Sequence, residues 1–177
     1  QLGGGFHRYS TDMFWLVPHF EKMLYDNALL VRLYLHAYQV TGKPLYRRIV
    51  AETLEYVLRE MTDPDGGFYS AQDADSEGEE GTFYVWPPSQ IRSAPSDPEP
   101  FLAAYGVTER GNFEGRRTVL IRRDGDPESE SLLSARRTLY EARAQREHPP
   151  TDDKLVVAWN GLTISGLART GRLLGEP

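Results

Sequence analysis

The chain has 177 residues, no cysteine and a formal net charge of −6 at pH 7. Disulfides, thiolate metal sites and a cysteine nucleophile are therefore excluded. Lysine and arginine form no run, which argues against both a nucleic-acid-binding stripe and a polybasic membrane anchor.

The first predicted elements form a helical hairpin. Pro18 is expected to start a helix, and apolar residues recur at helical spacing over 19–40. The breaker at 41–44 ends this helix, and a second helix is expected over 45–61. Because the connector is short, the two helices should be antiparallel neighbours.

The middle of the chain is predicted to hold short elements. Segments 68–70 and 82–86 are expected to pair as a β-hairpin around an acidic loop. Short helices are expected over 89–94 and 99–105, and a strand over 117–122.

The last third is predicted to contain two helices. Asp126-Pro127 has the pattern of a cap followed by proline at the first helical position. The apolar stripe of this helix comprises Leu132, Leu133, Leu139 and Tyr140, and its solvated face comprises Arg136, Arg137, Arg143 and Arg146. The final helix is expected over 153–174, where small residues allow neighbouring helices to approach closely.

A weak internal repeat relates two parts of the chain. Asn160 follows Asn27 by 133 residues (160 − 27), and Gly42 and Gly175 share this offset. Repeated helical hairpins with insertions would explain the pattern, although chance matches of a few residues are the alternative. If the repeat is real, the chain ends one helix into another hairpin. The lack of an initial Met and the turn-like last residues suggest that both ends lie inside a longer protein.

The first polar cluster covers 7–9 and 18–27. On the expected helix, Lys22 and Asp26 lie four residues apart and share a face. Histidine, lysine and carboxylate together could perform general acid–base chemistry, whereas an ordinary surface ion pair is the simpler interpretation. The candidate residues are His7, Arg8, Tyr9, His19, Glu21, Lys22, Asp26 and Asn27.

The second polar cluster is the acidic loop 72–81. Its oxygen-bearing residues resemble the start of a calcium loop, but the twelfth position, which requires Glu, is Tyr84. A sugar site is the other functional interpretation, since carboxylates accept hydrogen bonds from hydroxyls and aromatic rings stack on sugars. The alternative without a ligand is that the loop is simply a solvated acidic turn. The candidates are Gln72, Asp73, Asp75 and the flanking Trp86.

The third cluster lies near the start of the final helix. Asp152 could cap that helix, and the site candidates are Asp153, Lys154, Trp159 and Asn160. The sequence contains no nucleophile elbow, phosphate loop, dinucleotide fingerprint or zinc pattern. No metal or cofactor is therefore expected.

Several motif blocks occur together in a characteristic order. They are Gly-Gly-Gly-Phe-His-Arg-Tyr-Ser at 3–10, Pro-His-Phe-Glu-Lys-Met-Leu-Tyr-Asp-Asn-Ala at 18–28, Gln-Asp-Ala-Asp-Ser-Glu-Gly at 72–78, Asp-Asp-Lys at 152–154 and Trp-Asn-Gly at 159–161. With these blocks the chain resembles the thioredoxin-domain-containing, spermatogenesis-associated-protein-like family over nearly its whole length.

This resemblance implies a mainly α fold: antiparallel helical hairpins forming part of an (α/α)6 toroid, with short β-hairpin insertions. Residues 1–177 would be a fragment of one such domain, without the thioredoxin-like domain of the same protein. The toroid is similar to six-hairpin glycosidases and N-acylglucosamine 2-epimerases. His7 or His19 would suit an epimerase-like scheme, and Glu21 or Asp26 with Asp73 or Asp75 a glycosidase-like one.

The expected function is therefore that of a carbohydrate-active or carbohydrate-binding domain whose partner is a sugar or sugar derivative. The alternative is a non-catalytic interaction or scaffold module. A cytoplasmic location is compatible with the cysteine-free composition.

Overall fold

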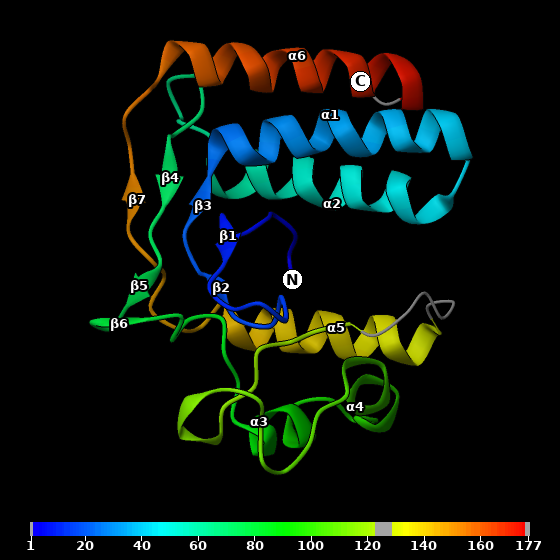
Figure 1. The fold of residues 1–177 in the computed structure, drawn as a ribbon, viewed down its shortest axis with the longest axis vertical. Helices are drawn as coiled ribbons and strands as arrows, with labels where there is room; N and C mark the ends of the chain where they lie inside the picture. Colours follow the sequence, from blue (N-terminus) through cyan, green and yellow to red (C-terminus); the bar gives the residue numbers. More distant parts are fainter. Residues whose placement is uncertain (1, 123–128, 176–177) are drawn as a thin grey trace. The chain divides into compact units, whose positions relative to one another are not determined.

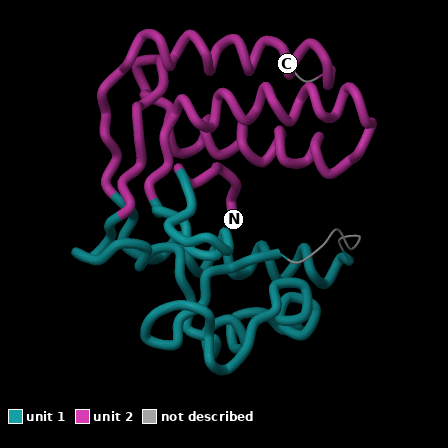
Figure 2. The backbone as a smooth tube through the Cα atoms, viewed as in Figure 1, with its two compact units in different colours: residues 1–2, 9–20, 75–149 teal, residues 3–8, 21–74, 150–177 magenta. Residues whose placement is uncertain are grey.

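The computed structural model of the chain describes residues 2–122 and 129–175. Within these residues the protein is mainly helical, with six α-helices and three small antiparallel sheets (Figure 1). The backbone divides into two compact units (Figure 2). Unit 1 comprises residues 1–2, 9–20 and 75–149, and unit 2 comprises residues 3–8, 21–74 and 150–177.

Unit 2 contains three long helices. They are α1 (Leu24–Thr41), α2 (Pro44–Glu60) and α6 (Val157–Leu174). α1 contacts both of the others, as Figure 1 shows. The connector from α1 to α2 is two residues long, with Gly42 in the left-handed conformation (φ 64°) and Pro44 opening α2. The predicted antiparallel hairpin is confirmed.

The core of unit 2 holds α6 against α1. Near the start of both helices, Leu24 packs with Tyr56 and Phe68, and Trp159 covers this cluster. Farther along, Leu174 at the end of α6 packs against the Val31 cluster of α1. α1 and α6 are therefore parallel, and each large apolar side chain buried here contributes about 1.5–3 kcal/mol.

Unit 2 also contains a three-stranded antiparallel sheet. Its strands are β3 (Lys22–Met23), β4 (Ala71–Gln72) and β7 (Thr151–Asp152), in the order β3-β4-β7. Because β3 pairs with β4, α1 begins at Leu24, and the prediction that Pro18 starts the helix is wrong. The final helix likewise begins at Val157 and not at 153.

Unit 1 combines two short hairpins with small helices. The elements are β1 (Tyr9–Ser10), β2 (Pro18–His19), β5 (Asp75–Ser76), β6 (Glu79–Glu80), α3 (Pro88–Ser93), α4 (Glu99–Tyr105), the 3-10 helix η1 (Glu114–Arg116) and α5 (Glu130–Arg143). α3 and α4 confirm the two predicted short helices. Their core includes Trp86, Ile91, Phe101, Leu132 and Leu139.

The predicted strand pairing in the middle of the chain is wrong. β5 pairs with β6 inside the acidic loop, whereas segment 68–72 supplies β4 of unit 2. The segment 82–86 forms a turn and a single bridge, from Trp86 to Thr118. That bridge is also the only pairing of the predicted strand 117–122 within the described ranges. Segments 68–70 and 82–86 are both rich in aromatic residues, whereas the true hairpin strands β5 and β6 have none, so composition did not identify the true partners.

The start of α5 differs from the prediction because another residue caps it. The Ser129 side chain accepts a hydrogen bond of 3.1 Å from Leu132 N. The predicted cap, Asp126-Pro127, lies outside the described residues.

The predicted solvated arginine face of α5 is only partly correct. Arg137 is exposed, but Arg143 is buried and donates to Leu2 O at 2.8 Å. Arg146 donates to the carbonyls of Thr82, Phe83 and Val85 and lies 3.9 Å from the centre of the Trp86 ring. Burial, with Arg143 nearby, lowers the pKa of Arg146 to about 10. Both arginines stabilise the fold of unit 1.

Candidate functional site

The N-terminal ends of α1 and α6 meet beside the sheet of unit 2 (Figure 1). β3 leads directly into α1, and β4 lies between β3 and β7, pairing Gln72 with both Lys22 and Thr151. Leu24 N donates to Ser70 O at 2.9 Å, which ties the first turn of α1 to the chain before β4. Since helix N-termini carry partial positive charge, two of them together favour acidic groups or acceptor-rich ligands.

Asn27 fixes the start of α1 to the glycine-rich turn. Its side-chain oxygen accepts from Phe6 N at 2.7 Å, and its nitrogen donates to Phe6 O at 3.3 Å and to Met23 O at 2.8 Å. The residue is fully buried, so the amide atoms of its own side chain are shielded from water. Asn27 is thus a clamp between a loop and a helix.

Asn160 forms the same clamp at the start of α6. Its oxygen accepts from Phe68 N at 2.7 Å, and its nitrogen donates to Phe68 O at 2.9 Å and to Val156 O at 3.2 Å. The clamped loops also match in sequence, Gly-Gly-Phe at 4–6 and at 66–68.

The two helices themselves correspond along their full length. α1 (24–41) and α6 (157–174) are each 18 residues long, and each ends at a left-handed glycine, Gly42 or Gly175. Starts, clamps and ends all share the offset of 133 that relates Asn27 to Asn160 (160 − 27). The structure therefore supports a real repeat over a chance match.

The first clamp is reinforced by a buried lysine. Lys22 is 1% exposed, and its Nζ donates to Gly4 O at 2.8 Å and lies 4.3 Å from the centre of the Tyr56 ring. Gly4 has φ +76°, and a Cβ there would lie 2.0 Å from Glu52 O, so only glycine fits. Since Lys22 belongs to β3, the predicted helical pair with Asp26 is wrong.

A charged group adjoins the start of α1. Arg8 Nη1 donates to Glu21 Oε2 at 3.0 Å, and hydrogen bonds with Tyr25 and Glu21 raise the pKa of the guanidinium. Asp26 lies close enough for the charges of Arg8 and Glu21 to affect its pKa. Burial raises the pKa of Asp26, the Arg8 cation opposes this change, and the Glu21 anion adds to it. Within the described ranges, Asp26 Oδ2 is buried without a hydrogen-bond partner.

Aromatic rings connect this group to α6. The Tyr25 and Trp159 rings lie 4.9 Å apart between centroids, at an interplanar angle of 56°. Both residues are partly exposed, so part of their ring surface is open to a ligand. We call Arg8, Glu21, Tyr25, Asp26 and Trp159 the helix-start cluster.

The third predicted cluster lies just before α6. Asp152 does not cap the helix, because the N-cap is Val156 and makes no side-chain bond there. Asp152 instead accepts from Lys154 Nζ at 3.0 Å, which together with backbone bonds lowers the pKa of Asp152. Asp153 is exposed; with Asp63 and Asp65 it adds to the effect of burial in raising the pKa of Tyr69.

Four predicted binding residues have partners inside unit 2. Lys22, Asn27 and Asn160 make the bonds described above, and Gln72 accepts from Tyr56 OH at 3.2 Å. Their side chains hold loops to helices, and direct contact with a ligand stays a prediction for them. His7 is partly buried, and Asp73 is exposed.

The remaining predicted residues belong to unit 1. His19 Nδ1 lies 2.8 Å from Glu80 Oε1. The centroid of its ring lies 5.0 Å from that of the Tyr9 ring. Asp75 lies in β5 and is exposed, whereas Trp86 is 2% exposed beneath Arg146. Trp86 therefore has little surface for a sugar to stack on.

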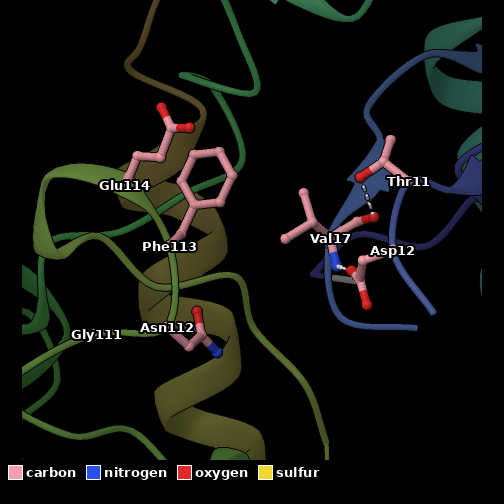
Figure 3. A pocket seen from close by; sticks show the side chains of 7 residues that line it. All are labelled: Thr11, Asp12, Val17, Gly111, Asn112, Phe113 and Glu114. Atoms are coloured by element: carbon pink, nitrogen blue, oxygen red, sulfur yellow. Dashed lines mark hydrogen bonds between the residues drawn. The ribbon is translucent and has the colours of Figure 1, made fainter. Parts of the chain in front are cut away.

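Sequence reasoning missed Tyr25 and a groove in unit 1. The proximity of Tyr25 to Asp26 in an aromatic-rich block was an available signal for the former. The groove holds a cavity of about 490 Å³ between two loops (Figure 3). It is lined by Thr11, Asp12, Val17, Gly111, Asn112, Phe113 and Glu114. No motif marked the second of these loops.

In residues 2–122 and 129–175, no group of three or more His, Asp or Glu side chains is placed to hold a metal ion. Within the same ranges, the helices are too short or too polar to cross a membrane.

Fold and site together define a helical-hairpin protein in which two parallel helices start around a polar and aromatic cluster. No family model matches the chain. Over nearly its whole length the chain is homologous to Spermatogenesis-associated protein 20, as the motif blocks predicted. It is 38% identical to the Homo sapiens protein over 99% of the chain, and 36% identical to the Mus musculus protein over 98%. The chain spans 27% of the length of each of these curated relatives.

Proposed function

We propose that the helix-start cluster binds a polyhydroxyl ligand, a sugar or sugar derivative. The observation that carries this proposal is the meeting of Arg8, Glu21 and Asp26 with the Tyr25–Trp159 ring pair at two adjoining helix starts. Carboxylates accept hydrogen bonds from hydroxyls, and a guanidinium donates them. The exposed ring surface suits the apolar face of a sugar.

The two carboxyl groups of the cluster support a glycosidase-like scheme over an epimerase-like one. Glu21 is paired with a permanent cation, whereas burial raises the pKa of Asp26. Carboxyl groups in different environments can divide the roles of base and acid. In this proposal Asp26 donates a proton to the leaving oxygen, and Glu21 acts as the base or nucleophile.

The wider architecture is part of the proposal. Parallel α1 and α6, with α2 antiparallel to α1, have the arrangement of consecutive hairpins in an (α/α) ring. Ile164 and Leu173 leave apolar surface exposed on α6, which a further hairpin would cover. We infer a toroid in the whole protein, together with a thioredoxin-like domain.

A scaffold module is the second candidate function. The observation in its favour is that the side chains of Lys22, Asn27 and Asn160 form hydrogen bonds with backbone atoms of the same unit. In that case the motif blocks hold the fold together and the helix-start cluster binds no ligand.

A thermal-shift experiment on the full-length protein separates the two candidates. The ligands are glucose, mannose, N-acetylglucosamine and N-acetylmannosamine, each with wild type, Glu21→Gln and Asp26→Asn. Glu55→Gln is the matched control, because Glu55 is an exposed carboxylate on α2 of the same unit. At about ten times Kd a ligand stabilises by about 1.4 kcal/mol, or roughly 3–6 °C for a cooperative unit of about 150–250 residues.

A sugar that raises the Tm of wild type and Glu55→Gln, but not of the two site variants, supports the proposal. A shift that survives in both site variants contradicts the assignment of these residues. No shift with any of the four sugars favours the scaffold candidate.

A further inference from the structure

Unit 1 contains a second surface that the helix-start cluster does not use. The cavity in Figure 3 adjoins one of about 420 Å³, and both are lined by Thr11, Val17, Phe113 and Glu114. We call the pair the loop groove. Its walls are the β1–β2 connection, β6 and the segment 111–117.

The loop groove has an apolar floor. Phe20 is 1% exposed, and its ring meets the Phe113 ring edge-on at 6.0 Å. Arg117 lies 5.5 Å from the centre of the Phe113 ring. Because Phe20 is covered, an aliphatic or aromatic side chain would pack against the partly exposed Phe113 ring.

The charge on the groove favours a cation. Glu79 lies 3.7 Å from Arg117, and Glu80 lies 2.8 Å from His19. Glu114 also lines both cavities, and within the described ranges its carboxylate has no ion-pair partner. With Asp12, which lines the first cavity, four carboxylates face one arginine and one histidine, which leaves an excess of negative charge.

The tip of the β1–β2 connection presents an apolar surface beside this charge. Met13, Phe14 and Trp15 are 84%, 79% and 83% exposed. Asp12 holds the tip, accepting from Phe14 N and Val17 N at 2.6 Å each. Trp15 has φ 57°, a left-handed conformation that is costly for a bulky residue. A fixed conformation that exposes three large apolar side chains is typical of an interaction surface.

We propose that the loop groove and this tip bind an extended peptide segment in which basic residues alternate with apolar ones. The basic side chain pairs with Glu114, and the apolar ones contact Phe113 and the tip. β6 pairs only with β5 among the described strands, so its outer edge offers backbone groups to an extended chain. This edge favours a peptide over a small cation.

The test is fluorescence anisotropy with the full-length protein and a labelled peptide, acetyl-Gly-Arg-Phe-Lys-Leu-Gly-amide. The control peptide has Glu in place of Arg and Lys. We expect saturable binding of the basic peptide that weakens with added salt. Glu114→Gln should weaken it about three- to tenfold and Phe14→Ser about tenfold. Glu130→Gln, an exposed carboxylate of unit 1, should leave it unchanged.

Three outcomes overturn the proposal. They are no binding of the basic peptide up to about 1 mM, equal binding of the acidic peptide, and equal binding by Glu114→Gln and Glu130→Gln. Binding of neutral phosphatidylcholine vesicles through Phe14 without peptide binding also overturns it, because the tip would then be a lipid contact. Circular dichroism melts of each variant verify that it is folded.

Discussion

The starts of α1 and α6 use one clamp in two different settings. In both, an asparagine one turn into the helix bonds the backbone of a Gly-Gly-Phe loop. Around Asn27 the surroundings are buried and charged, and Lys22 lies beneath the loop. Beside Asn160, the residue that corresponds to Lys22 is Leu155, which is 48% exposed. One position before each asparagine, α1 carries Asp26 and α6 carries Trp159. The clamp is thus constant, and the residues beside it supply the chemistry that differs.

The largest expected effect comes from removing the clamps. Asn27→Ala leaves buried N–H and C=O groups without partners and should lower the free energy of unfolding by about 3 kcal/mol. Asn160→Ala should cost about half of that, because water can reach part of its site. Urea denaturation measures both, with the exposed Gln39→Ala on α1 as control. Equal losses, or a larger loss for Asn160→Ala, would show that burial does not distinguish the clamps.

A smaller effect is expected at the residues beneath the two loops. Lys22→Ala removes a buried stem and the donor to Gly4 O, so the free energy of unfolding should fall by about 2 kcal/mol. Leu155→Ala removes a half-exposed side chain and should cost below about 0.5 kcal/mol. Urea midpoints of the two variants in the same buffer test this. If Lys22→Ala left the free energy of unfolding unchanged, the buried ammonium would not be needed for stability.

The smallest expected effect is on pH dependence, and it concerns Asp26 alone. Burial raises the pKa of Asp26 above its ordinary value of 3.8. In the window above 3.8 the folded protein therefore binds this proton more tightly than the unfolded chain, and the stability contribution of Asp26 falls as pH rises.

Asp26→Asn removes that titration, so the stability of this variant relative to wild type should increase between about pH 4 and pH 7. Urea midpoints across this range measure the difference. Glu55→Gln serves as the control. Parallel profiles for wild type and Asp26→Asn would contradict the predicted contribution.

The sequence predicted the helical parts of the fold better than the sheets. The breaker at 41–44 and the apolar spacing placed the α1–α2 hairpin, and the asparagine offset anticipated the repeat. The strands are two residues long and pair across large separations, as Ala71 does with Asp152. A two-residue strand has no periodicity to detect, and helical spacing continued across 18–23 by coincidence.

The sequence predicted most residues of the candidate site, but it did not predict how they are arranged. Glu21, Asp26, Arg8 and Trp159 were all named from the motif blocks, but which of them meet depends on the tertiary contact between α1 and α6. The environments of Arg143 and Arg146 likewise depend on tertiary contacts that the sequence did not reveal. Their charge suggested a solvated face, while aromatic neighbours distant in sequence provide a buried setting.

The hydrogen bond from Asp73 N to Pro150 O, at 2.8 Å, has a consequence for how this protein can vary. The chain leaves unit 2 and re-enters it at adjacent points, as the pairing of Gln72 with Thr151 also requires. The entropic cost of closing such an excursion grows only with the logarithm of its length, about 0.6 kcal/mol per doubling. Insertions and deletions between these points should therefore be tolerated by the helices of unit 2, which leaves that stretch open to rapid divergence.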